Sequence, residues 1–200
     1  MADATEVHEN IQEANEKKGT RWIGVYIACL AVLLAITSMG GSNSMKDMIN
    51  ANVEVTNYWG FFQAKNIRQT EFRLAAERLE VDLAINPTMP EAARKDIEAK
   101  IKRYKDTAAR YESDPKEGDG KKELMAKARS MEAERAKAQR KDPYFDYAEA
   151  FLQIAIVLAS VTIITGALPL LLGSLGVGLL GTLLMLNGFT LFLQIGFLEH

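Results

Sequence analysis

The chain is poor in residues that usually carry chemistry, with one cysteine and two histidines among its 200 residues. A single cysteine excludes an intrachain disulfide and a zinc site made of cysteine pairs. Cys29 lies in an apolar run, where cysteine ordinarily acts as a small apolar filler. His200 belongs to a terminal Leu-Glu-His that is either native or the start of an expression tag, so it carries no weight. We therefore expect no metal and no cofactor.

Catalytic motifs are missing as well. The sequence has no HExxH, no P-loop and no G-x-S-x-G. Carboxylates are spread among lysines and arginines, as in Glu98 and Lys102, which is typical of solvated helix faces. The net charge is -2 with mixed signs, and the aromatic residues do not alternate with a basic patch. We expect neither an enzyme nor a nucleic-acid partner.

No segment has the alternating pattern of a β-strand, and no internal repeat of 20 to 50 residues is present. Apolar and charged residues are instead strongly separated along the chain. The apolar residues gather in 22–39 and 151–198, whereas most charges lie between residues 46 and 149. This separation predicts an all-α membrane protein with a charged, coiled-coil-like helical domain inserted between its spans.

Three transmembrane helices are expected, so the lipid bilayer is a predicted partner. Residues 22–39 have no charge and are near the minimum length for crossing a membrane. The tail before them, 1–21, is polar and acidic, which favours an uncleaved anchor over a signal peptide. Residues 151–198 are too long for one crossing and contain Pro169 and Gly173, so we predict helices at 147–168 and 175–198.

The charged domain, 44–146, is predicted to contain three helices. They run from about residue 44 or 53 to Ile85, from a capping box at Thr88 and Glu91, and over about 121–141. Asn86-Pro87 and Asp142-Pro143 are expected to end the first and third.

Antiparallel packing of these three helices would point the third away from the membrane that it must re-enter. Two alternatives solve this problem. Either the first helix breaks within 50–57, or the loop at 113–120 lets the third helix continue in the direction of the second.

The second helix of this domain carries an apolar seam. Its members recur at steps of four and three, as in a short coiled coil. They are Ile97, Ile101, Tyr104, Ala108 and Tyr111. We expect this seam to make protein contacts.

Residues 57–69, NYWGFFQAKNIRQ, form an aromatic patch. Tyr58, Trp59, Phe61 and Phe62 cover a broad arc of a helix into which Lys65 intrudes. Such a face is expected either to be buried in the domain or between protomers, or to lie in the lipid headgroup zone. The patch, with Gln63 and Lys65, is predicted to be an interaction surface.

Small residues form one stripe on each predicted span, and such stripes let helices pack closely in lipid. The stripes are Gly24, Ala28, Ala31, Ala35 and Ser38; Ala155, Ala159, Thr162 and Gly166; and Ser174, Gly178, Gly181 and Thr182. Polar residues lie on other faces of the last two spans, namely Gln153, Asn187, Thr190 and Gln194. Hydrogen bonding between helices or protomers is one role for them, and a polar pore lining is the other.

The stretch WGFFQAKNIRQ, the preceding AVLLAITS and the two-span hairpin together resemble a family of uncharacterised bacterial membrane proteins. In that family a tryptophan-aromatic-glutamine-alanine-lysine motif follows the first span. The resemblance implies a bacterial inner-membrane location and the motif positions Trp59, Gln63, Ala64 and Lys65, but no catalytic residue. The histidine-rich leader common in such proteins is reduced here to His8, which argues against metal binding.

Basic residues near the spans favour opposite orientations. Lys17, Lys18 and Arg21 favour a cytoplasmic N-terminus, whereas the reverse is favoured by Lys46, Arg135, Lys137, Arg140 and Lys141. Our functional expectation is a non-enzymatic multipass membrane protein that self-associates or serves as an accessory or scaffold subunit of a larger complex. The alternative is an oligomeric pore or channel subunit.

Overall fold

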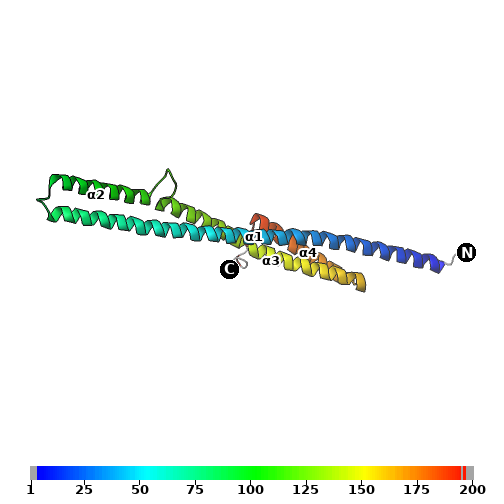
Figure 1. Cartoon of the computed structure of the whole chain (residues 1–200). Coiled ribbons are helices and arrows are strands. Elements are labelled where there is room, and N and C mark those ends of the chain that lie inside the picture. Colours follow the sequence, from blue (N-terminus) through cyan, green and yellow to red (C-terminus); the bar gives the residue numbers. More distant parts are fainter. Residues whose placement is uncertain (1–3, 195, 197–200) are drawn as a thin grey trace. The chain divides into compact units, whose positions relative to one another are not determined.

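A computed structural model of the chain describes the backbone of residues 4–194 and 196, and the side chains from residue 21 onward within these ranges. It contains four helices and no strand in the described part: α1 (Ala4–Ile85), α2 (Glu91–Glu112), α3 (Lys121–Thr165) and α4 (Leu168–Thr190) (Figure 1). This confirms the predicted all-α fold class. His200 lies outside the described residues.

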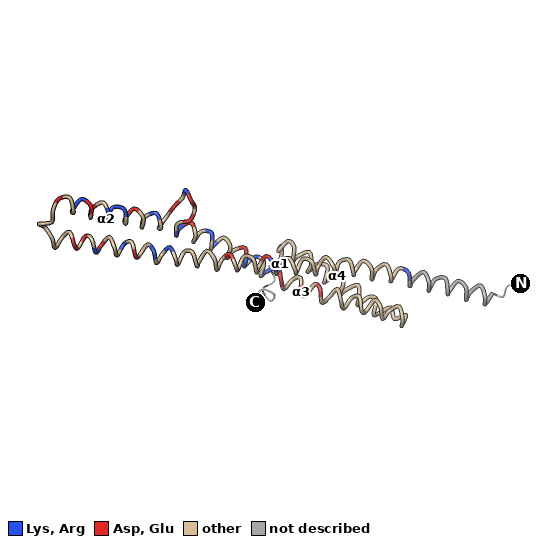
Figure 2. The backbone as a smooth tube through the Cα atoms, viewed as in Figure 1, with Lys and Arg blue, Asp and Glu red and all other residues tan. Residues whose placement is uncertain are grey.

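The chain divides into two compact units. The apolar unit comprises Met1–Asp47 and Lys137–His200, and the charged unit comprises Met48–Ala136. α1 and α3 each contribute one part to each unit. Figure 2 shows the charges concentrated on α2 and on the adjoining parts of α1 and α3, whereas α4 carries none.

Three of the helices are long and apolar enough to cross a membrane. They are α1, α3 and α4, and at most 28% of the residues in the apolar stretch of each are buried inside the protein. This agrees, by length and composition, with the expectation of three spans.

The ends of α1 and α2 follow local backbone chemistry. α1 ends at Ile85, directly before Asn86-Pro87, because the residue before a proline is disfavoured in the helical conformation. α2 begins at Glu91, and its N-cap is Pro90 with no side-chain hydrogen bond. The predicted capping box of Thr88 and Glu91 is therefore wrong, because the cap position falls two residues beyond Thr88.

Pro143 does not end a helix, contrary to the prediction. It lies inside α3, which continues to Thr165. The next two side chains, Tyr144 and Phe145, are almost completely buried in the apolar unit. Their packing stabilises the helix through a position where proline removes one backbone hydrogen bond.

The break proposed within residues 50–57 is also absent, since α1 is continuous to Ile85. In the charged unit both α2 and the start of α3 pack on α1: Gln69 contacts Ala108 of α2, and Trp59 contacts Glu132 of α3. The loop at 113–120 thus connects two helices that follow α1 one after the other. This is the second of the two predicted alternatives.

The apolar hairpin turns earlier than predicted. Gly166 has a φ of 65° and its N–H donates to the carbonyl of Thr162, which is the usual geometry of a glycine that ends a helix. Pro169 then occupies the first turn of α4, where proline is well tolerated. The predicted turn at 169–174 was wrong, and α4 covers 168–190 instead of 175–198.

Close approach of α3 and α4 forms the interior of the apolar unit. Ala155 and Ala159 are fully buried, and a Cβ at Gly181 would lie 3.0 Å from Cγ of Leu152. The small residues of these two helices leave a groove that larger side chains of α1 fill, with Leu30 buried and Tyr26 and Leu34 packed beside it.

The small-residue stripe of α1 does not face this interior. The stripes were predicted to let the spans pack closely, and for α1 this prediction does not hold within the described part of the chain. Its members Gly24, Ala28, Ala31, Ala35 and Ser38 are all exposed. Around Leu30 the reason is complementarity of size: the other two helices already supply small residues there, so α1 contributes larger ones.

Candidate functional site

The inward half of residues 57–69 binds α3. The indole N–H of Trp59 donates a 2.9 Å hydrogen bond to the Glu132 carboxylate, and the Trp59 ring meets Phe62 edge to face at 5.4 Å. The Lys121 ammonium lies 5.7 Å from the Phe62 ring centre. This part of the aromatic patch is therefore an internal contact of the charged unit.

Gln69 is the centre of the charged unit, because its buried amide joins three helices. Its Nε2 donates to the carbonyl of Ala108 and to the Glu112 carboxylate, both at 2.9 Å. Its Oε1 accepts a 2.7 Å hydrogen bond from Lys121, which also donates to Asn66. Each polar atom of the side chain has a partner, as a buried amide requires.

Carboxylates around this junction are held in their charged form. The hydrogen bond from Gln69, followed by that from Lys121, lowers the pKa of Glu112 below its ordinary value of 4.5. The Lys65 ammonium lies 2.6 Å from Asp119 and lowers the pKa of that carboxyl below 3.8. The contacts of Glu112 and Asp119 hold the end of α2 and the loop before α3 against α1.

The seam of α2 also faces α1. Phe72 of α1 lies 5.5 Å from the Tyr104 ring and 5.9 Å from the Tyr111 ring, and Ile101 and Ala108 are buried. Ile97 is partly buried. The seam is thus part of the interior of the charged unit, and it is not available as a surface for another protein.

The outward half of residues 57–69 is largely exposed in the described part of the chain. Phe61 and Ile67 are each 60% exposed, and a Cβ on Gly60 would meet no atom within 4 Å. Gln63 and Ala64 are exposed as well, whereas Tyr58 is partly buried. The motif that carries the family resemblance therefore serves two faces, since Trp59 and Lys65 point inward while Gln63 and Ala64 point outward.

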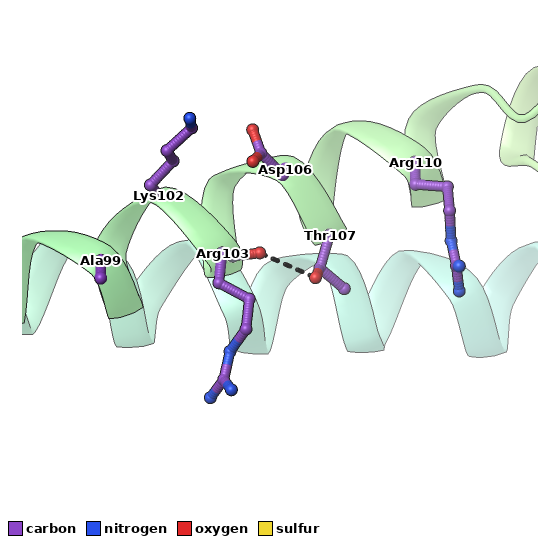
Figure 3. A pocket seen from close by; sticks show the side chains of 6 residues that line it. All are labelled: Ala99, Lys102, Arg103, Asp106, Thr107 and Arg110. Carbon is purple, nitrogen blue, oxygen red and sulfur yellow. Dashed lines mark hydrogen bonds between the residues drawn. The ribbon is translucent and has the colours of Figure 1, made fainter. Parts of the chain in front are cut away.

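A shallow hollow on the surface of α2 had no signal in the sequence. It is lined by one helix face: Ala99, Lys102, Arg103, Asp106, Thr107 and Arg110 (Figure 3). The Thr107 hydroxyl donates to the backbone carbonyl of Arg103, and Arg110 lies 3.8 Å from Asp114. Figure 3 shows Lys102 and Arg103 extending in different directions, so their charges do not converge on one point.

The polar residues of the last two spans are bonded locally. Asn187 donates to the carbonyl of Leu193 at 2.7 Å and accepts from its N–H at 2.8 Å. These two bonds hold the segment that follows α4 against the end of that helix. Thr190 donates to the carbonyl of its own helix at Leu186, and Gln153 donates to Glu149. Gln194 is exposed. Within the described residues no hydrogen bond links these four, so the structure does not gather them into a polar lining.

One polar contact inside the apolar unit joins all three helices. The Tyr26 hydroxyl of α1 donates to the carbonyl of Ser174 at 3.0 Å, and the Ser174 hydroxyl donates to the carbonyl of Ala155 at 2.7 Å. Tyr26 was not singled out by the sequence, because a lone tyrosine in an apolar run gives no signal about its partner. Among the described residues no group of three or more histidine, cysteine or acidic side chains could hold a metal ion.

A family model described as a domain of unknown function (DUF4337) matches residues 19–191. The match covers the apolar stretches of all three long helices and the whole charged unit. No curated protein and no solved structure matches the chain.

Proposed function

We propose that this chain, which belongs to the DUF4337 family, is a non-enzymatic multipass protein of the bacterial inner membrane. In this proposal α1, α3 and α4 cross the bilayer. The charged unit self-associates or docks onto a larger membrane complex as an accessory subunit.

The observation that carries the membrane part is the outward apolar surface of the apolar unit. Leu179 and Leu183 of α4, Val157 of α3 and Val32 of α1 are each more than half exposed. The charged unit has no comparable all-round apolar surface. Side chains of this kind on three neighbouring helices need a solvent as apolar as lipid, because water would make their exposure costly.

The interaction part is supported by how the charged unit uses its residues. Its hydrogen bonds and ion pairs, such as Lys105 with Glu80 and Lys65 with Asp119, link α1 to α2 and to the loop after it. These contacts do not bring an acid, a base and a nucleophile together at one point. A rigid unit built this way can present a surface to another protein.

The experiment that tests this proposal is gentle extraction of the chain from native membranes, followed by native mass measurement and identification of every co-purifying protein. We expect either a homo-oligomer or a stoichiometric complex with a foreign subunit. A chain that alkaline carbonate releases from membranes would contradict the membrane location. A monomer without partners would contradict the interaction role.

A further inference from the structure

In the charged unit the exposed large apolar residues all lie on one helix. Within 48–136, where every residue is described, α2 and α3 have none, whereas α1 has several. α2 and α3 cover one side of α1, so this apolar side is the one that they leave bare. The residues concerned are Ile49, Val53, Phe61, Ile67, Leu74, Val81 and, at the end of α1, Ile85.

Four of these seven residues form, together with Gly60, a regular stripe, here called the outer stripe: Val53, Gly60, Ile67, Leu74 and Val81. They recur every seven residues. Because a helix has 3.6 residues per turn, positions seven apart lie on nearly the same side of α1. The four side chains other than glycine are 49–60% exposed, so the described part of the chain does not cover them.

Charges beside the outer stripe are arranged to fit the same stripe on another copy. Glu77 and Arg78 flank Leu74 and Val81 on opposite sides, and neither has an ion pair in the described part of the chain. By contrast, Arg73 and Glu80, on the side that faces α2, are paired with Glu112 and Lys105. Neighbouring residues on a helix point about 100° apart, so Glu77 and Arg78 cannot pair with each other.

We propose that the outer stripe binds the outer stripe of a second copy of this chain, with the two α1 helices parallel and in register. Glu77 of each copy then lies beside Arg78 of the other, which makes two ion pairs by symmetry. Ile67, Leu74 and Val81 each meet their own counterparts, and the absence of a side chain at Gly60 lets the two backbones approach. This inference rests on the proposed membrane function, and it identifies the partner as a second copy of the chain.

The parallel direction follows from the proposed membrane function, because copies inserted in the same direction carry continuous α1 helices that run the same way. An antiparallel pair centred on Ile67 would also keep all five positions. It would place Val81 opposite Val53 and Leu74 opposite Gly60, so neither would meet its own counterpart. The exposed small-residue stripe of α1 in the apolar unit is an independent observation, because its spacing also suits a parallel helix pair between copies that cross the membrane in the same direction.

Single-cysteine cross-linking in native membranes tests the inference. Cys29→Ala removes the one natural cysteine, and Leu74→Cys, Val81→Cys or Asp82→Cys is then introduced. We expect oxidation to give a dimer several-fold more abundant for Leu74→Cys and Val81→Cys than for Asp82→Cys, an exposed position turned about 100° from Val81. Equal yields at Val81 and Asp82 would overturn the inference, as would no dimer at all. Val81 is decisive because an antiparallel pair centred on Ile67 would place it beside Val53 and not beside itself.

A charge exchange tests the ion pairs without touching the packed interior. Arg78→Glu or Glu77→Arg in the Val81→Cys background is expected to lower the dimer yield about fivefold, and the double exchange to restore it. Failure of the double variant to recover would contradict the proposed register. The chain could resist carbonate extraction and co-purify with a foreign subunit, yet give no cross-link in the outer stripe. That result would overturn only this inference. A carbonate-resistant monomer without partners would overturn the interaction role as well.

Discussion

The ammonium group of Lys121, the first residue of α3, donates a 2.7 Å hydrogen bond to the amide oxygen of Gln69, which is buried on α1. The same amide donates to the last turn of α2 through Ala108. One side chain therefore fixes where α2 ends and where α3 begins. This explains how an eight-residue loop can connect two helices that follow α1 in succession.

Gln69→Ala is expected to destabilise the charged unit by about 2 kcal/mol, because it removes buried hydrogen bonds to the Ala108 carbonyl, to Glu112 and from Lys121. The measurement is urea unfolding followed by Trp59 fluorescence in a Trp22→Phe chain, where Trp59 is the one remaining tryptophan. Gln63→Ala is the matched control, since that glutamine is exposed on the same helix. Equal urea midpoints for the two variants would contradict the central role of Gln69.

In the apolar unit, Gly40→Ala is expected to weaken the packing of α1 on α3 and α4. An added Cβ would lie 2.6 Å from the Phe145 ring, and that ring cannot retreat because Gly188 borders it closely. Overpacking of this kind costs about 1–3 kcal/mol. Thermal unfolding in detergent should show a lower midpoint, whereas Gly176→Ala, where a Cβ meets nothing within 4 Å, should leave it unchanged.

A second change separates this steric explanation from a general effect of the extra methyl group. Phe145→Leu introduced together with Gly40→Ala should recover part of the lost stability, because it shortens the group that the new methyl meets. If the double variant were less stable than the sum of both single effects predicts, the steric explanation would be wrong.

Local signals in the sequence were sufficient for several features of the fold. The separation of apolar from charged residues predicted the three long apolar helices, and Pro87 predicted the end of α1. Pro143 misled because a proline is a local signal, whereas the burial of Tyr144 and Phe145 that keeps α3 intact is a tertiary effect. Tertiary packing overrides local propensity wherever enough surface is buried.

The packed face of α1 could not be predicted for a different reason. The helix carries one face with small residues such as Ala28 and another with bulky residues such as Leu30. In lipid both faces are equally compatible with the solvent, so hydrophobicity does not decide between them. The choice depends on the shape of the groove that α3 and α4 present, which no pattern within α1 contains.

Tyr26 and Ser174 are expected to stabilise the three-helix packing of the apolar unit together. Tyr26→Phe and Ser174→Ala should each lower the thermal midpoint, by an amount that corresponds to about 1 kcal/mol per hydrogen bond. Because the two groups share one network, the double variant should lose less than the sum of the single losses. Ser160→Ala is the control, since that exposed hydroxyl bonds only to its own helix, and strict additivity would contradict the network.

The charged unit is expected to lose stability in acid. The pKa values of Glu112 and Asp119 are lowered in the folded chain, mainly by hydrogen bonds from Gln69 and Lys65. Folding therefore favours their charged forms, and the resulting stability is complete above the ordinary values of 4.5 and 3.8 and is lost as the pH falls through the lowered ones. Urea midpoints from Trp59 fluorescence should be constant near neutral pH and should fall below about pH 4.5.

Glu112→Gln should reduce this acid sensitivity because the amide does not titrate, although its weaker bond to Lys121 should also lower the midpoint at pH 7. Asp96→Asn replaces an exposed carboxylate of α2 that has no ion pair among the described residues, so it should leave the pH profile as it was. A profile of Glu112→Gln that parallels the unmodified chain at every pH would show that other carboxylates cause the loss. In that case the Gln69–Glu112–Lys121 contact would hold the helices together without making their stability depend on pH.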